Sequence, residues 1–227
     1  MKQFKKALEK LEATAAGLDP NEISEDDAGW QERKSAQMRV TILEATVQCL
    51  AEYGYTKTST QFVASTAKVS RGAMLHHFPT KLDLVDAVID HIDAKRLRSI
   101  LDGLTDLTPD QRLNSGQPLE IVWNLQKTTE AQAHLELNMA ARTDAAVREI
   151  FDPKAVRYRK LILDVIPDIY PEWRETPKAD LELAHEIIMI SVYGMNINER
   201  LYKDRAKRIA MRNFIFKAAQ TLRKDED

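Results

Sequence analysis

Apolar residues recur every three or four positions along most of this 227-residue chain, a spacing that gathers them on one face of an α-helix. The pattern predicts helices over residues 34–53, 58–66, 70–78, 81–101, 119–125, 131–150, 154–166, 179–202 and 204–222, with a further amphipathic helix near the N-terminus. Only seven residues are glycine, which is few for the many turns of an all-β fold. An all-α protein is therefore expected.

The helical pattern is interrupted in two places. Residues 19–27 are acidic and contain a proline, and residues 102–118 hold two glycines and two prolines. The chain is therefore expected to divide into an N-terminal extension over 1–33, a three-helix module over 34–82 and a larger helical domain over 83–227. The long helix over 81–101 is assigned to the larger domain. The extension is either a surface helix with a solvated linker or an arm that touches DNA or a partner subunit.

The strongest local signals lie between residues 58 and 84. Thr58 with Gln61, and Thr80 with Asp83, have the spacing of capping boxes, and Ser70 is the N-cap candidate of the helix between them. Pro79 ends that middle helix because it disfavours helical geometry at the residue before it. Two short helices, a tight joint and the start of a third form the layout of a helix-turn-helix, which places its second helix in the DNA major groove.

This segment resembles the DNA-binding domain of the TetR family, the tetracycline-repressor family of regulators. The resemblance is carried by Thr60, Val63-Ala64, Ala67-Lys68-Val69-Ser70, Arg71-Gly72-Ala73, His76-His77-Phe78 and Lys81. It implies a homodimeric repressor of transcription that a small-molecule effector releases from a pseudo-palindromic operator. An activator, or a regulator of the same fold that answers to no ligand, remains an alternative.

The expected contacts with double-stranded DNA come from both short helices and the helix that follows. The candidate residues are Thr58, Thr60, Ser70, Arg71, Gly72, Ala73, Leu75, His76 and Lys81. Arg71 can bind guanine in bidentate fashion or grip a phosphate, while Gly72 and Ala73 allow close approach to the groove floor. The resemblance places phosphate contacts at Thr58, Thr60 and Lys81.

Two positions depart from the family pattern. Lys68 stands where the joint usually has glycine, so either Lys68 has an unfavourable φ or the joint differs. Leu75 stands where a tyrosine often grips phosphate, which suggests contact with a thymine methyl group instead.

Charge supports a DNA-binding module. The chain has a formal net charge of -2, yet residues 33–82 contain seven basic and two acidic residues, so that this window carries +5 and the remainder -7. A basic module on an acidic body suits a protein that touches phosphates with one end only.

The helix over 179–202 has two apolar stripes and therefore needs two covers. One stripe contains Leu181, His185, Ile188, Val192 and Met195, and the other contains Leu183, Ile187, Ile190, Gly194, Ile197 and Leu201. One stripe is expected to pack against the chain's own domain. The other is expected to pack against the last two helices of a second subunit, which would form a four-helix bundle, and the alternative is that the whole helix is buried in a monomer core. The dimer-interface candidates are Ile188, Val192, Met195, Phe214 and Ala218.

The effector pocket is expected in the C-terminal domain. Its candidate lining mixes apolar walls with a few polar groups: Trp123, His134, Met139, Arg142, His185, Met189 and Tyr193. Each also has a structural interpretation, such as Trp123 and Met139 as core residues and Arg142 as the partner of Asp144 or of another nearby acid. Arg142 would suit an acidic ligand.

Other functional classes find little support. His76 and His77 are adjacent and point about 100° apart on a helix, so no metal site is expected, and no cofactor motif is present. A small helical enzyme using Glu182 and His185 is a remote alternative, because the segment HEII lacks the second histidine of a zinc-protease helix. Cys49, the single cysteine, is expected in the core. No stretch is apolar enough to span a membrane, so a cytoplasmic protein is expected.

Overall fold

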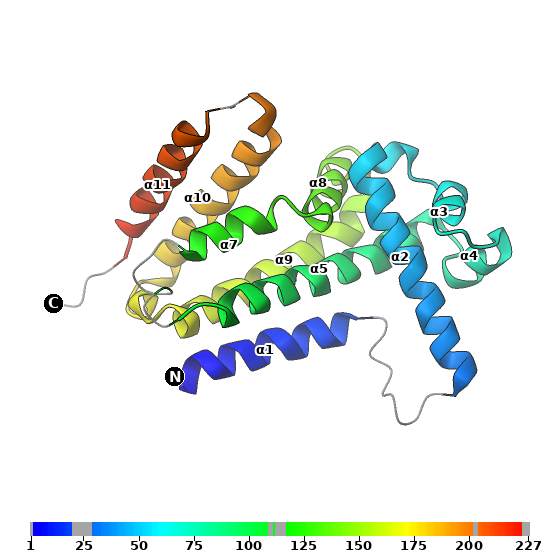
Figure 1. The fold of residues 1–227 in the computed structure, drawn as a ribbon, viewed down its shortest axis with the longest axis horizontal. Coiled ribbons are helices and arrows are strands. Elements are labelled where there is room, and N and C mark those ends of the chain that lie inside the picture. Colours follow the sequence, from blue (N-terminus) through cyan, green and yellow to red (C-terminus); the bar gives the residue numbers. More distant parts are fainter. Residues whose placement is uncertain (1, 20–28, 109–110, 112–116, 202–203, 224–227) are drawn as a thin grey trace. The chain divides into compact units, whose positions relative to one another are not determined.

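The computed structural model describes residues 2–19, 29–108, 111, 117–201 and 204–223, and every regular element in these ranges is helical (Figure 1). The helices are α1 (Lys2–Leu18), α2 (Trp30–Lys57), α3 (Thr60–Thr66), α4 (Arg71–His77), α5 (Lys81–Thr105), α7 (Gln117–Leu125), α8 (Thr129–Ala141), α9 (Ala145–Ile169), α10 (Lys178–Ile197) and α11 (Arg205–Gln220), with short 3₁₀ turns at Pro171–Trp173 and Glu199–Leu201. In these ranges no helix combines the length and apolar character that crossing a bilayer requires.

The chain forms two packing units. The α2–α8 unit contains residues 11–99 and 128–158, and the α10–α11 unit contains residues 1–10, 100–127 and 159–227. These units do not follow the expected domain limits at residues 33 and 82, because α8 and the first part of α9 pack with α2 to α5. The functional division into an extension, a module and a body therefore stays a prediction.

The core of the α2–α8 unit is built from the apolar faces of α2, α5 and α8 with the two short helices added at one side. Its largest fully buried side chains are Ile42, Leu43, Leu50, Met74, Phe78, Leu84, Ile89, Ile92 and Leu137. Cys49 is also buried in this cluster, as its helical register predicts, and its thiol lies 3.4 Å from the Thr66 hydroxyl. Burial raises the pKa of the Cys49 thiol.

Helices α8 and α9 divide differently from the expected 131–150 and 154–166. The break lies at Asp144, whose carboxylate accepts hydrogen bonds from the backbone N–H groups of Ala146 and Val147 at 3.0 and 3.3 Å. Pro153 does not begin a new helix but lies inside α9. Its lost backbone hydrogen bond is tolerated because residues on both sides of it, Phe151 and Ala155, pack on the same core.

Two residues with positive φ shape the region around the short helices. Gly54 has φ 77° and interrupts helical geometry near the end of α2, as the sequence predicts. Lys68, in the joint between α3 and α4, has φ 56°. The first of the two alternatives for Lys68 is therefore confirmed: the joint keeps its left-handed residue although a side chain is present.

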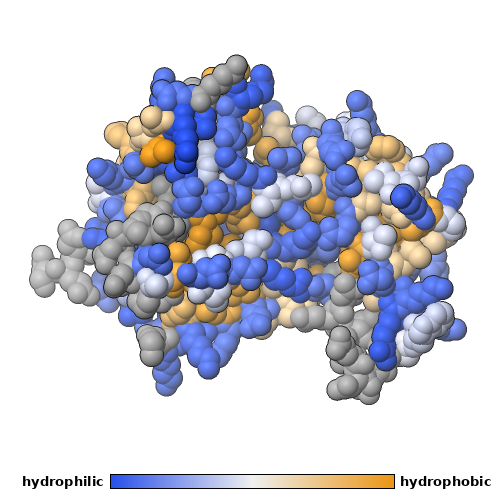
Figure 2. Space-filling model, in the orientation of Figure 1, coloured by the Kyte–Doolittle hydropathy of each residue, from blue (hydrophilic) through white to orange (hydrophobic). Residues whose placement is uncertain are grey.

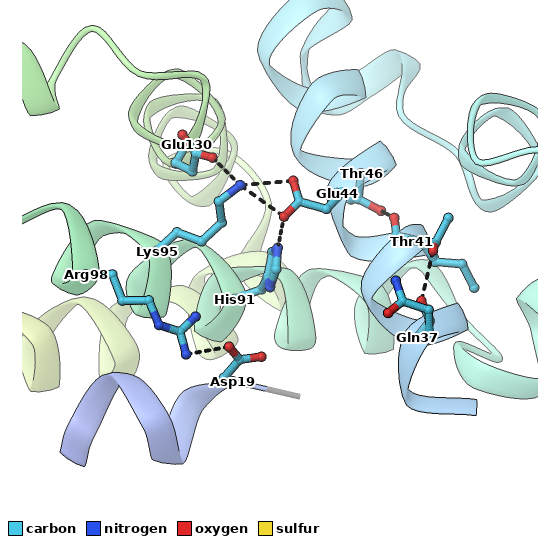
Figure 3. A network of polar contacts seen from close by, with 10 residues as sticks. Asp19, Gln37, Thr41, Glu44, Thr46, His91, Lys95, Arg98 and Glu130 are labelled. Atoms are coloured by element: carbon cyan, nitrogen blue, oxygen red, sulfur yellow. Dashed lines mark hydrogen bonds and ion pairs between the residues drawn. The ribbon is translucent and has the colours of Figure 1, made fainter. Parts of the chain in front are cut away.

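A polar network joins three helices of this unit (Figure 3). Glu44 of α2 accepts a hydrogen bond from His91 Nε2 at 3.0 Å and is paired with Lys95 Nζ at 3.0 Å, both from α5. Lys95 also pairs with Glu130 of α8 at 2.5 Å. The hydrogen bond from His91, and then Lys95, lower the pKa of Glu44 to about 2 against the opposing effect of burial.

The α10–α11 unit has two smaller apolar clusters. One contains Trp173, Leu181, Ala184 and Ala219, and the other contains Trp123, Val192 and Met195. Helix α11 begins at Asp204, whose carboxylate caps the N–H groups of Ala206 and Lys207. Helices α10 and α11 lie side by side, and both clusters draw on them (Figure 1).

Substitution at Lys68 tests the strain in the joint. The Lys68→Gly variant is expected to be more stable than Lys68→Ala by about 1 kcal/mol, because a Cβ in the left-handed region costs roughly 1–2 kcal/mol and the greater chain entropy of glycine offsets part of this. Urea unfolding of the two variants measures the difference. An alanine variant as stable as the glycine variant would show that the joint has a different backbone in solution.

The network at Glu44 makes stability depend on pH. At neutral pH, Glu44→Gln is expected to lower the free energy of unfolding by about 1 kcal/mol, a value discounted because the carboxylate is 46% exposed. Since the folded-state pKa of Glu44 lies below its ordinary value of 4.5, this stabilisation is fully present above pH 4.5 and is lost as the pH falls towards 2. Unfolding curves of both proteins between pH 7 and about pH 2 should therefore converge at the acidic end, and a constant difference would contradict the ion-pair explanation.

Candidate nucleic-acid interface

Helix α3 begins one residue later than the capping motif predicts. Ser59 is its N-cap, and Ser59 Oγ accepts a hydrogen bond from the backbone N–H of Phe62 at 3.1 Å. Thr58 is 2% exposed, and its hydroxyl donates to the carbonyl of Gly54 at 2.9 Å. The expected Thr58–Gln61 capping box is therefore wrong: the turn at Gly54 draws the Thr58 hydroxyl into the end of α2.

Helix α4 is positioned by one cap and two anchors. Ser70 caps it as predicted, because Ser70 Oγ accepts a hydrogen bond from the N–H of Ala73 at 3.1 Å. Met74 and Phe78 are each 1% exposed and fix one side of the helix in the core. The opposite side is exposed and carries Arg71, Gly72, Leu75 and His76, with Ala73 half-buried beside it. The structure thus brings five of the nine predicted DNA-contact residues onto or next to one short surface.

The start of α5 is fixed by reciprocal capping. The N–H of Thr80 donates to Asp83 Oδ2 at 2.9 Å, and the N–H of Asp83 donates to Thr80 Oγ1 at 3.1 Å, as the sequence predicts. Lys81 is the next residue after Thr80, and its Nζ donates a hydrogen bond to the backbone carbonyl of Tyr55 at 2.7 Å. The same Nζ lies 3.7 Å from the centre of the Tyr55 ring. Burial lowers the pKa of Lys81. This lysine therefore ties α5 to the last turn of α2, and its contact with phosphate stays a prediction.

His76 and His77 differ in environment although they are adjacent. His76 is exposed, whereas His77 is half-buried, and their ring centres lie 5.3 Å apart. Burial, and then the electrostatic effects of His76 and Arg39, lower the pKa of His77. In the ranges that the structure describes, no three His, Cys, Asp or Glu side chains are grouped so that they could hold a metal ion.

One contact near α4 was not anticipated from the sequence. The guanidinium of Arg39, on α2, lies 4.9 Å from the centre of the Phe78 ring, which ends α4. Cation–aromatic contacts of this kind join residues far apart in the sequence, so periodicity gives no sign of the pairing. The basic residue at 39 within the helical pattern is the only sequence signal.

The candidate effector residues are divided between the two packing units. Trp123 is buried, and His185, Met189 and Tyr193 are half-buried, in the α10–α11 unit. In the α2–α8 unit, His134 is 9% exposed with its ring 5.0 Å from that of Phe151, and burial lowers its pKa well below the usual range. Met139 is 47% exposed and not part of the core, and Arg142 donates to its sulfur at 3.9 Å. The expected partner of Arg142, Asp144, instead caps the start of α9.

The assignment of the two α10 stripes has to be reversed. Val192 and Met195, taken as interface candidates, are 1% and 7% exposed and pack with Trp123 inside the same chain, and Ile188 lies against the same cluster. Of the other candidates, Ala218 is half-buried and Phe214 is 74% exposed. The exposed stripe of α10 is the second one, in which Leu183, Ile190 and Ile197 are 48%, 66% and 51% exposed. Figure 2 shows hydrophobic surface among hydrophilic side chains in the region of α10 and α11.

Comparison with other sequences shows that one segment of the chain matches a known family. Residues 42–88 match the sequence pattern of bacterial regulatory proteins of the tetR family. The HTH-type transcriptional regulator CymR of Pseudomonas putida is 26% identical over 190 residues, which cover 84% of this chain and 93% of CymR. The HTH-type transcriptional repressor KstR of Mycolicibacterium smegmatis is 33% identical over 96 residues, which cover 40% of this chain and 45% of KstR.

Solved structures show the same fold. GusR of Salmonella enterica superposes with a TM-score of 0.65 at 19% identity, over 84% of this chain and 97% of GusR. The multidrug binding protein EbrR, solved in complex with imidazole, gives a TM-score of 0.61 at 17% identity, over 83% of this chain and 96% of EbrR. The capped and anchored helix-turn-helix lies inside the segment that matches the tetR family, so residues 42–88 form a DNA-binding domain of that type and the chain is a DNA-binding transcriptional regulator.

Proposed function

We propose that this protein is a cytoplasmic homodimeric repressor that binds a pseudo-palindromic operator and is released from it by a small molecule. The observation that carries the proposal is the exposed side of α4, where Arg71, Leu75 and His76 project opposite the buried anchors Met74 and Phe78. A helix held in this way is rigid enough to enter a major groove, and two copies related by a two-fold axis would enter successive grooves.

Each exposed residue of α4 has a role that follows from its chemistry. Arg71 donates to guanine O6 and N7, Leu75 contacts a thymine methyl group, and the small residues Gly72 and Ala73 let the helix backbone approach the groove floor. Thr60, Ser70 and His76 supply contacts with phosphates beside the groove. Thr58 and Lys81 would reach phosphate only if they gave up their present partners in α2.

The exposed apolar stripe supports dimer formation. Leu183, Ile190 and Ile197 of α10 and Phe214 of α11 are each about half exposed or more. An apolar surface on two neighbouring helices is costly in water, and the same pair from a second copy would bury it as a four-helix bundle. TetR-family regulators act as dimers, so a second copy of this chain is the proposed partner.

The effector proposal rests on two observations. EbrR, which shares this fold, is a multidrug binding protein solved with imidazole. In this chain the candidate residues Trp123 and His185 lie in the α10–α11 unit, and burial lowers the pKa of His185. A lower pKa favours the neutral imidazole, which can accept a hydrogen bond. Met189 and Tyr193, which lie in the same unit, are the other proposed contacts.

Replacing Arg71 by alanine tests the base contact. Affinity for a duplex selected from randomised DNA is expected to fall by about 1–3 kcal/mol, the value of a bidentate contact with guanine, while affinity for unrelated duplex changes little. Mobility shifts at one fixed salt concentration measure both. Arg200→Ala, which removes the same side chain from an exposed position after α10, is the matched control and should bind like the wild type. Equal losses on both duplexes would instead assign Arg71 to phosphate.

Replacing Ile190 by aspartate tests the dimer. A charge in the centre of the exposed stripe should convert the dimer to a monomer in sedimentation experiments and weaken operator binding, because each subunit would then hold its half-site alone. Val156→Asp places the same charge at another exposed apolar residue, 63% exposed on α9, and should remain dimeric. If Ile190→Asp also remained dimeric, α10 would not form the interface.

A further inference from the structure

The N-terminal helix α1 lies outside the segment that matches the family, yet its C-terminal half is firmly packed. Leu11 and Ala15, one turn apart, are 0% and 1% exposed, and both belong to the α2–α8 unit. Such complete burial of one helix face excludes a solvated arm over residues 11–18. The small alanine side chain also allows close approach of the helix to its neighbours.

The end of α1 is attached to α5 by an ion pair. Asp19 follows the last turn of α1, and its carboxylate lies 2.5 Å from the guanidinium of Arg98, with the aspartate side chain only 12% exposed. Arg98 lies on the same helix as Lys95 and His91, which hold α2 and α8 (Figure 3). Helix α5 is therefore bound to α1, α2 and α8 along one stretch.

The end of α1 also lies near Arg39, a residue that contacts the end of α4. Residues 17–19 line a cavity of about 210 Å³ together with Arg39 and Leu43 of α2 and with Asp86, Ala87 and Asp90 of α5. Arg39 then lies over the ring of Phe78, the buried residue that ends α4. Arg39 thus lines one cavity with the end of α1 and also contacts the residue that ends α4.

We propose that α1 is an intramolecular brace for DNA binding, and that Arg39 is the positioning residue through which it acts on α4. The seven-residue α4 cannot hold its own orientation, so the packing of buried Phe78 determines how Arg71 and Leu75 meet the bases. With α1 in place, residues 17–19 bound one side of the cavity beside Arg39. The brace rests on the DNA-binding function, because its effect is on sequence-specific affinity.

The test loosens α1 in the full-length protein. Leu11→Asp combined with Ala15→Asp places two charges on the buried face, and Gln3→Asp combined with Ala13→Asp places the same charges on exposed positions as a control. Release of α1 is followed by trypsin cleavage at its lysines. Affinity is measured by mobility shift on the duplex selected by the wild type and on unrelated duplex.

Loosening α1 is expected to weaken specific binding about tenfold, within the range for substitutions that act through packing, and to leave binding to unrelated duplex unchanged. Arg39→Gln should cause a similar loss and Arg39→Lys a smaller one, because lysine keeps a cation for the Phe78 ring. Combining Arg39→Gln with the loosened α1 should add no further loss, since both act along one path.

Several results would overturn the proposal. Wild-type affinity in a protein whose α1 is shown to be released would remove the brace, and fully additive losses would remove Arg39 from the path. Should the double variant lose its helical circular dichroism, Asp19→Asn decides, since it breaks only the ion pair and should still weaken specific binding about threefold. Failure of the wild type to select any sequence would instead reject the DNA-binding function itself.

Discussion

The burial of Met74 and Phe78 is the constraint on which the DNA-binding surface depends. Isolated helices of seven residues are unstable in water, so α3 and α4 exist because their apolar sides are taken into a core made by α2 and α5. Removing a buried aromatic side chain typically costs about 3–5 kcal/mol, which shows how strongly such an anchor holds its helix. The polar groups on the outer side of α4 are thus free for recognition because none of them is needed for packing.

Apolar burial does not fix how the helices are rotated against one another. The charged contacts do so, because they join specific atoms. Glu44, His91, Lys95 and Glu130 join α2, α5 and α8 at defined atoms, so a rotation of any of these helices would leave a partly buried charge without a partner. Lys81 makes a further polar contact at the start of α5, where its Nζ donates to the carbonyl of Tyr55 in α2. The module that carries α4 is therefore held by a core and by polar contacts at two levels.

Local features of the fold could be predicted where they depend on neighbouring residues. The cap at Ser70, the reciprocal cap of Thr80 and Asp83, and the turn at Gly54 all follow from contacts within four residues. The error at the start of α3 arose because Thr58 and Ser59 are both hydroxyl residues, and the sequence does not show that the Thr58 hydroxyl bonds to the carbonyl of Gly54 and leaves Ser59 as the cap.

Features that depend on what covers a surface could not be predicted. Both stripes of α10 are apolar, and the sequence does not say that Trp123 packs on Val192 and Met195, which leaves Ile190 outside. Pro153 misled for the same reason, because core packing on both sides keeps α9 continuous. Arg39 is one of several basic residues in the sequence, and its contact with the Phe78 ring depends on tertiary packing that the sequence pattern does not show.

The single buried cysteine has a practical consequence. Because Cys49 is the only thiol and its pKa is raised by burial, thiol-reactive probes will react faster with a cysteine introduced at the surface. One such residue near α4 would place one spectroscopic label on each subunit without removal of the native thiol. In the proposed dimer, the separation of the two recognition helices, free and on DNA, then becomes directly measurable in the otherwise natural protein.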